Sequence, residues 1–172
     1  LEKIKIEKKN VIFVSAHFNN FELMAMEIEK NGINLAAIYR PLNNKFLNHT
    51  MENIRKNYIC KIQIKKGMSG SREILKFIKQ GYSIALMIDQ RVSEGISSNF
   101  FNRKAMTTTI PASLVKKFNI DIVPVYIERT KKYSFRIAFH NPINFKGEKS
   151  VEKITNELNK VVEKMIIKNP EQ

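Results

Sequence analysis

A histidine and a glutamate in the first part of the chain are the residue types that general-base catalysis needs. His17 and Glu22 are separated by four residues. A carboxylate that holds one nitrogen of an imidazole fixes the tautomer of the ring. It also stabilises the imidazolium that forms when the other nitrogen accepts a proton. The pair therefore indicates a general base. The alternative is a structural role, in which His17 caps a helix or packs at the end of a strand.

The spacing of this pair restricts the elements that can position it. Two residues five positions apart on one helix point in directions about 140° apart, so His17 and Glu22 cannot meet on a single helix. They can meet if a strand ends just before His17 and Glu22 lies in the first turn of the following helix. Residues 11–14 are continuously apolar, as expected of a strand buried on both faces. Asn19 or Asn20 is suited to cap the helix.

Arg72 is a second candidate, because we expect it in the first turn of a helix. The helix dipole disfavours a cation there, and a bound anion would reverse that effect. Free backbone N–H groups and a guanidinium together can form a phosphate site. Gly67 and Gly70 precede Arg72 and allow the backbone to approach a ligand closely. The alternative is a solvated Arg72 that is screened by its neighbour Glu73.

Asp89 and Gln90 follow another apolar run and form a third candidate. If that run is a parallel strand, both residues lie at the same carboxyl edge of the sheet as His17, where ligands gather in such folds. They could orient a polar substrate there, although an aspartate at a strand end is also a common turn former. Phe100 and Phe101 could line a groove for an acyl chain or fold inward as core.

The elements that must position these residues are predicted by the pattern of apolar side chains. Short β-branched runs alternate with longer amphipathic ones, which is typical of repeated strand–helix units. We expect a single α/β domain over residues 1–172, with a mixed, mainly parallel sheet that is flanked by helices and has some antiparallel edge. The expected strands are 11–14, 34–39, 59–64, 83–88, 122–128 and 133–139, the helices are 21–30, 44–56, 72–80, 109–119 and 151–167, and residues 89–106 form a long polar loop.

The composition limits the classes of partner and cofactor. Thirty Lys and Arg against 16 Asp and Glu give a net charge of +14, which attracts acidic proteins, phosphorylated lipids, anionic membranes or nucleic acid. Cys60 is the single cysteine, so an internal disulfide and a Cys-rich zinc site are excluded. The glycine loops that bind nucleotide phosphates are absent, so we expect no cofactor and no metal. No apolar stretch approaches the roughly 18 to 20 residues of a membrane span.

Several segments, taken in order, resemble the lipid A biosynthesis acyltransferases, the late or secondary acyltransferases within the lysophospholipid acyltransferase superfamily. The segment from His17 to Glu22 resembles the H-x4-[DE] signature of that superfamily. The further matching segments are residues 39–44, Ser71-Arg72-Glu73, Asp89-Gln90, Phe100-Phe101, residues 105–109 and the strand with Pro124. The likeness covers about residues 11–133. Asn19 stands where the family often has Gly, and Phe21 stands where it often has Trp.

The resemblance implies a fold like that of the glycerol-3-phosphate and lysophospholipid acyltransferases. It also implies transfer of a fatty acyl chain from an acyl carrier protein thioester to a hydroxyl of a lipid A precursor. His17 would take the hydroxyl proton, Glu22 would orient and stabilise His17, and no covalent enzyme intermediate would form. The residues that the resemblance assigns to substrate binding are Asn20, Arg40, Arg72 and Asp89.

The same resemblance implies where the protein works and with which partners. We expect an acyl carrier protein as donor, a phosphorylated glycolipid as acceptor and an anionic membrane surface, at the cytoplasmic face of the bacterial inner membrane. Nucleic acid is not expected as a partner. Members of the family usually have an N-terminal membrane anchor and a helical region before the histidine motif. The sequence begins at Leu1 without either, so we expect a shortened chain.

Two other functions are compatible with these residues. A glycerophospholipid acyltransferase would use the same His17 and Glu22, but those enzymes usually show Glu-Gly-Thr-Arg where this chain has Asp89-Gln90-Arg91. A non-catalytic basic module that binds RNA or membranes would have the same net charge. It would retain its activity when His17 is replaced, and its binding to nucleic acid would fall steeply with salt.

Overall fold

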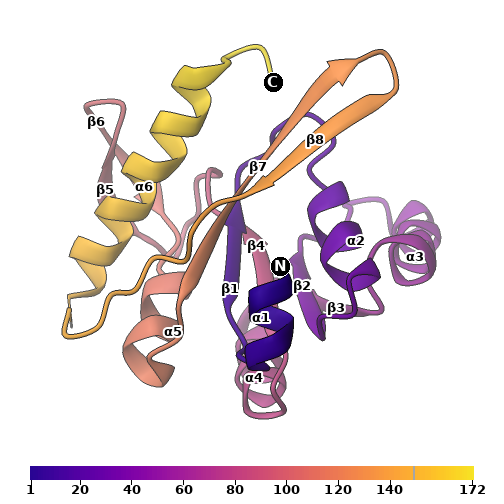
Figure 1. Ribbon diagram of the computed structural model, residues 1–172, viewed down its shortest axis with the longest axis horizontal. Helices are drawn as coiled ribbons and strands as arrows, with labels where there is room; N and C mark the ends of the chain where they lie inside the picture. The colour runs from indigo at the N-terminus through magenta and orange to yellow at the C-terminus, as the bar shows by residue number, and fades with distance from the viewer. Residues whose placement is uncertain (149) are drawn as a thin grey trace. The chain divides into compact units, whose positions relative to one another are not determined.

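The computed structural model describes residues 1–148 and 150–172 and has the expected α/β architecture (Figure 1). Helices and strands alternate along the first half of the chain. The elements in this half are α1 (Glu2–Glu7), β1 (Ile12–Ser15), α2 (Leu23–Lys30), β2 (Leu35–Tyr39), α3 (Lys45–Ile54), the π-helix η1 (Arg55–Ile59), β3 (Ile62–Lys65), α4 (Met68–Lys79) and β4 (Ser83–Met87). Those in the second half are β5 (Ile96–Phe100), β6 (Arg103–Thr107), α5 (Ile110–Phe118), β7 (Ile122–Lys131), β8 (Ser134–Phe139) and α6 (Val151–Lys168).

The main sheet has six strands in the order β3-β2-β4-β1-β7-β8. Strand β2 runs parallel to both β3 and β4, and β8 runs antiparallel to β7 at the edge. Strands β5 and β6 form a separate antiparallel pair. This arrangement confirms the predicted α/β class with a mixed, mainly parallel sheet flanked by helices.

Contacts divide the chain into two compact units. Unit 1 comprises residues 1–13 and 22–86, and unit 2 comprises residues 14–21 and 87–172. The expectation of one domain over residues 1–172 stays a prediction. In unit 1, α2 and α4 bury one apolar side each, and fully buried side chains from the strands complete the core. The largest fully buried residues of this unit are Ile12, Phe13, Met24, Ile28, Ile64 and Ile84.

The core of unit 2 has a polar as well as an apolar part. Its largest fully buried apolar residues are Val14, Ile122, Val123, Tyr126, Ile127 and Ile154. Helix α6 lies along β5, where the amide of Asn159 donates to the hydroxyls of Ser98 and Thr107 over 3.0 and 3.1 Å. Because these groups are buried, the hydrogen bonds compensate for the free-energy cost of removing them from water.

The strand pair β5–β6 corrects the expectation of a long irregular loop over residues 89–106. Its inward positions include Ser98 and Thr107 instead of apolar residues, so the period-two apolar signal of a strand is weak. Phe101 and Asn102 turn the hairpin with φ angles of 48° and 60°. Two consecutive residues at positive φ form the kind of tight turn that matches the twist of a hairpin.

Among the described residues, no helix is long and apolar enough to cross a membrane. In the same part of the chain, His, Cys, Asp and Glu side chains form no group of three that could hold a metal ion.

Candidate active site

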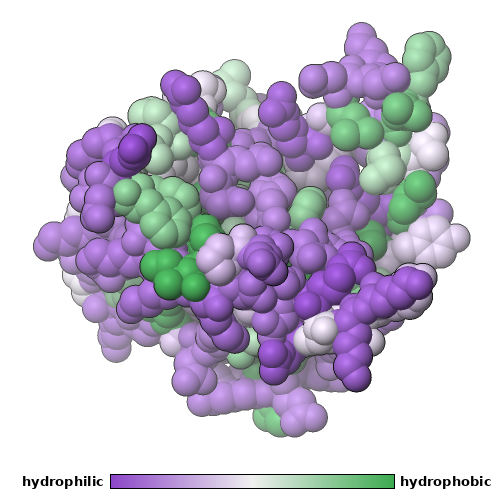
Figure 2. Space-filling model, turned by 90° about the horizontal axis from the view of Figure 1, so that it is seen from above, coloured by the Kyte–Doolittle hydropathy of each residue, from purple (hydrophilic) through white to green (hydrophobic). Residues whose placement is uncertain are grey.

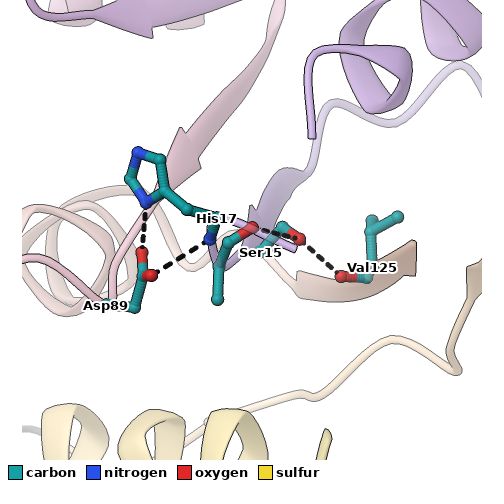
Figure 3. Close-up of polar contacts among 5 residues, drawn as sticks. Ser15, His17, Asp89 and Val125 are labelled. Atoms are coloured by element: carbon teal, nitrogen blue, oxygen red, sulfur yellow. Dashed lines mark hydrogen bonds and ion pairs between the residues drawn. The ribbon is translucent and has the colours of Figure 1, made fainter. Parts of the chain in front are cut away.

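The chain leaves β1 in a tight turn that presents His17. The buried hydroxyl of Ser15 donates to the backbone oxygen of Val125 over 2.7 Å, which fixes the end of the strand (Figure 3). The amide of Phe18 donates to the carbonyl of Ala16 over 2.7 Å and closes a three-residue turn around His17. Phe18 is itself buried. The backbone is therefore held on both sides of His17.

Asp89 meets His17 at the carboxyl edge of the sheet. The amide of Ile88 donates to the carbonyl of Ser15 over 3.0 Å, so the chain segments that follow β1 and β4 start side by side. One carboxylate oxygen of Asp89 accepts the backbone N–H of His17 over 3.0 Å. The other lies 2.7 Å from Nδ1 of the imidazole (Figure 3). Asp89 was expected at the same edge as His17, but its two hydrogen bonds to His17 were not predicted. Its role in substrate binding stays a prediction.

This geometry selects the tautomer of His17. Burial raises the pKa of Asp89, but the hydrogen bonds from His17 outweigh it and hold the pKa below its ordinary value. Asp89 is therefore ionised at neutral pH, and an ionised carboxylate can only accept hydrogen bonds. The proton must then sit on Nδ1 of His17, which leaves the lone pair of Nε2 free. With 31% of its side chain exposed, His17 is accessible to a substrate.

Two neighbours further restrict the segment around His17. The ring of Phe21 meets the imidazole edge-on, with centroids 4.7 Å apart. Arg129 donates from Nε to the amide oxygen of Asn19 over 3.1 Å and stacks on Phe135 at 4.6 Å. Sequence reasoning missed Arg129. The expected strand ended at residue 128, so Arg129 was expected in a connecting turn, where an exposed cation is ordinary, whereas β7 continues to Lys131.

Glu22 lies in unit 1, where its carboxylate pairs with Arg55. One oxygen accepts from Nε over 2.8 Å and from Nη2 over 2.7 Å. Arg55 begins η1 and lies over the ring of Tyr39, and its buried Nη1 has no hydrogen-bond partner among the described residues. A buried donor of this kind is available to a bound anion. The pairing of His17 with Glu22 stays a prediction.

Arg55 was missed by sequence reasoning for an identifiable reason. The sequence assigned residues 44–56 to one helix, so Arg55 was expected in its last turn, where a cation is ordinary. The structure ends α3 at Ile54 and continues in the π-helix η1. Such π-turns are rare and occur frequently at functional sites, but they have no simple sequence signature.

Two local expectations at helix starts are wrong. Helix α2 begins after Glu22 and has no side-chain cap, so neither Asn19 nor Asn20 caps it. Helix α4 begins at Met68, so Arg72 lies beyond the first turn. The dipole argument for an anion at Arg72 therefore does not hold. The reason is that Gly70, expected in a loop, belongs to the helix.

The other predicted substrate residues lie at the surface. Asn20, Arg40 and Arg72 are all exposed, and the role of each in binding stays a prediction. The rings of Phe100 and Phe101 meet edge-on at 4.9 Å, and Phe101 is 42% exposed. Phe101 is thus not core, whereas Phe18 is.

The fold and the site define an α/β protein with a carboxylate-bound histidine at the carboxyl edge of a mainly parallel sheet, which is an arrangement suited to general-base catalysis. The sequence profile of the bacterial lipid A biosynthesis acyltransferases matches residues 1–172, and the chain belongs to that family. It is similar to lipid A biosynthesis acyltransferase 2 of Shigella flexneri, with 24% identity over 176 residues. That alignment covers 100% of the chain and 55% of the relative, so the chain spans about half the length of the curated relative.

Proposed function

We propose that this chain transfers a fatty acyl group from an acyl carrier protein thioester to a hydroxyl of a lipid A precursor. The observation that carries the proposal is the contact of 2.7 Å between Asp89 and Nδ1 of His17. In a chain of the lipid A acyltransferase family, it supports a histidine whose Nε2 is free to act as base.

The proposed reaction involves two transfers of one proton, first from the acceptor hydroxyl to His17 and then from His17 to the leaving thiolate. Nε2 of His17 takes the proton of the acceptor hydroxyl as its oxygen attacks the thioester carbonyl. The C–S bond of the resulting tetrahedral intermediate then breaks, and the imidazolium returns the proton to the leaving thiolate. The products are an ester and a free thiol on the carrier, and no covalent enzyme intermediate forms.

Two carboxylates are proposed to support the imidazolium. The H-x4-E resemblance assigns this role to Glu22, and the hydrogen bonds to His17 support the same role for Asp89. A negative charge close to Nδ1 stabilises the ring in its protonated state and fixes its orientation. The pair of Glu22 with Arg55 supports a further contribution of Glu22, through an arginine that has a free donor.

The charge of the chain supports the proposed partners. A net charge of +14 favours an acidic carrier protein, a phosphorylated glycolipid and an anionic membrane. The exposed guanidinium groups of Arg40 and Arg72 are proposed to bind the acceptor's phosphates, and Asn20 to hydrogen-bond the substrate next to the base. We place the reaction at the cytoplasmic face of the bacterial inner membrane.

The test is transfer of a radiolabelled acyl chain from acyl carrier protein to a lipid A precursor. The variants are His17→Ala and, as a matched control, His140→Ala, which removes an exposed histidine elsewhere in unit 2. General-base catalysis contributes about 10²- to 10⁴-fold, so His17→Ala should lose transfer by that factor and His140→Ala should not.

Other outcomes would point to the other functions. Label that moves only to glycerol phospholipids would reject lipid A as acceptor while keeping His17 as base. If His17→Ala performs like the parent, the chain is not the proposed enzyme. Binding to nucleic acid that weakens steeply with salt would then indicate a basic binding module.

A further inference from the structure

Helix α3 carries an apolar side that nothing in unit 1 covers. The helix has no buried residue, and Phe46, Leu47 and Ile54 are 91%, 57% and 40% exposed. At about 100° per residue, these three side chains and Thr50 fall in one sector of roughly 100°. A helical sector of that width and composition normally faces a core. We call Phe46, Leu47 and Ile54 the apolar face of α3.

The opposite side of α3 is held to unit 1 by polar contacts. Glu52 accepts from Asn48 over 2.7 Å, pairs with Lys65 over 3.1 Å and accepts from the hydroxyl of Tyr39. Asn48 also accepts the backbone N–H of Leu42 over 2.8 Å. The helix thus points its polar groups inward and its apolar groups outward, the reverse of a helix that packs on a core. The outward face is suited to an apolar surrounding.

Exposed apolar residues are concentrated in this part of the chain. The face of the molecule in Figure 2 is mostly hydrophilic, with hydrophobic residues exposed in separate groups. Of the ten large exposed hydrophobic residues in the described chain, six lie between residues 42 and 68. They are Leu42, Phe46, Leu47, Ile54, Tyr58 and Met68. Single exposed apolar residues need no explanation, but the three that share one side of α3 form a contiguous patch, which is typical of an interaction surface.

The segment that contains the apolar face carries mainly positive charge. Between residues 40 and 66 there are seven Lys and Arg and a single acidic residue, Glu52, which gives +6. The side chain of Glu52 is only 15% exposed, and its charge is paired with Lys65. The exposed cations are Arg40, Lys45, Lys56, Lys61, Lys65 and Lys66. The segment therefore combines exposed apolar side chains on one side of α3 with a net positive charge.

We propose that α3 docks unit 1 on an anionic lipid bilayer, with Phe46, Leu47 and Ile54 inserted at the boundary between headgroups and acyl chains. An exposed apolar helix face in a segment rich in lysine is the combination that lies in the interface of an anionic bilayer. An acidic protein would satisfy the lysines but not a protruding row of apolar side chains. The role of this docking rests on the proposed function, because docking would bring the chain to its lipid acceptor.

Vesicle binding tests the docking. Co-sedimentation is measured with vesicles of phosphatidylglycerol and phosphatidylcholine, and with vesicles of phosphatidylcholine alone. The double variant Phe46→Gln with Leu47→Gln should bind anionic vesicles at least about tenfold more weakly than the parent. The matched control is Ile6→Gln with Ile167→Gln, which removes two other side chains that are 80% and 65% exposed. It should bind like the parent.

A second variant tests the charge without touching the apolar face. Lys45→Glu with Lys56→Glu should weaken binding to anionic vesicles by about fivefold per lysine and leave the weak binding to phosphatidylcholine unchanged. Its control reverses Lys30 and Lys79, which are exposed elsewhere in unit 1. Circular dichroism of all variants shows whether the fold is kept. If the glutamine variant is unfolded, the charge variant provides the test of docking.

Two results would overturn the docking: a parent chain that does not bind anionic vesicles, or a folded glutamine variant that binds as tightly as the parent. An assay of acyl transfer to an acceptor dispersed in detergent distinguishes failure of the docking from failure of the proposed function. The glutamine variant should keep the parent's transfer rate there, because no bilayer is needed. A parent that binds vesicles through α3 but transfers no acyl group would retain the docking and reject the function.

Discussion

Replacement of Asp89 by asparagine changes the candidate base with almost no change in volume. Asp89 accepts two hydrogen bonds from His17, one from the backbone N–H and one from Nδ1. Asparagine has one acceptor oxygen, and its nitrogen donates. If the oxygen keeps the backbone N–H, the amide nitrogen faces the ring. It then selects the tautomer with the proton on Nε2, which cannot act as base.

The expected loss of activity is much larger than the expected loss of stability. Blocking the base should lower kcat by about 10²- to 10⁴-fold, the usual contribution of general-base catalysis, which corresponds to about 3–5 kcal/mol in the barrier. The folded state loses one charge-assisted hydrogen bond, which should lower the free energy of unfolding by about 1–2 kcal/mol. The protein should therefore stay folded while transfer is lost.

The two effects are measured separately. Acyl transfer gives kcat, and urea unfolding gives stability across a pH series. Because the pKa of Asp89 is lowered in the folded chain, the carboxylate stabilises the fold above the ordinary carboxyl pKa. That stabilisation is lost as the pH falls through the folded value. The stability difference between parent and Asp89→Asn should thus be full at neutral pH and shrink in acid. Transfer by Asp89→Asn within about threefold of the parent would refute the proposed tautomer control.

Two further predictions concern the packing of unit 1. Gly70→Ala should destabilise the chain by more than about 2 kcal/mol, because the added Cβ would lie 1.9 Å from the carbonyl oxygen of Lys65. Gly81→Ala, where φ is +83° and nothing lies within 4 Å, should cost only about 1 kcal/mol; equal losses in urea unfolding would argue against the close approach. The thiol of Cys60 is 1% exposed and burial raises its pKa to about 12, so a disulfide reagent should modify it only in urea, and rapid modification of the folded chain would contradict this.

The fold could be predicted because its strands and helices have strong apolar periods. Residues 11–14 were expected as a strand buried on both faces, and β1 is buried along its whole length. The hairpin β5–β6 could not be predicted in the same way. Its inward side is stabilised by hydrogen bonds from Asn159, which lies 61 positions from Ser98 in sequence. A polar core depends on hydrogen-bonding side chains that are distant in sequence, and the local pattern of apolar residues does not show them.

The start of α4 shows how a distant contact changes a local prediction. Gly67 and Gly70 together indicate a loop, because glycine disfavours helices. Gly67 does lie outside the helix, at a φ of +135°, but Gly70 is inside it. There the carbonyl of Lys65 occupies the space that a Cβ would need. Gly70 therefore allows close packing and does not form a turn. Because α4 begins before Gly70, Arg72 lies beyond the first turn of the helix.

The partner of the candidate base also could not be predicted from local sequence. Variants of the two carboxylates, Glu22 and Asp89, can show which of them supports His17. Spacing in sequence can relate His17 only to nearby acids, so it selected Glu22. The structure adds Asp89, 72 positions away. Glu22→Gln leaves the guanidinium of Arg55, with 13% of its side chain exposed, without a matching charge, which should cost about 1–3 kcal/mol of stability. If Glu22 acts only through Arg55, kcat should fall far less in Glu22→Gln than in Asp89→Asn. If the two variants lose kcat equally while Glu22→Gln stays fully stable, Glu22 supports His17 directly, as Asp89 does.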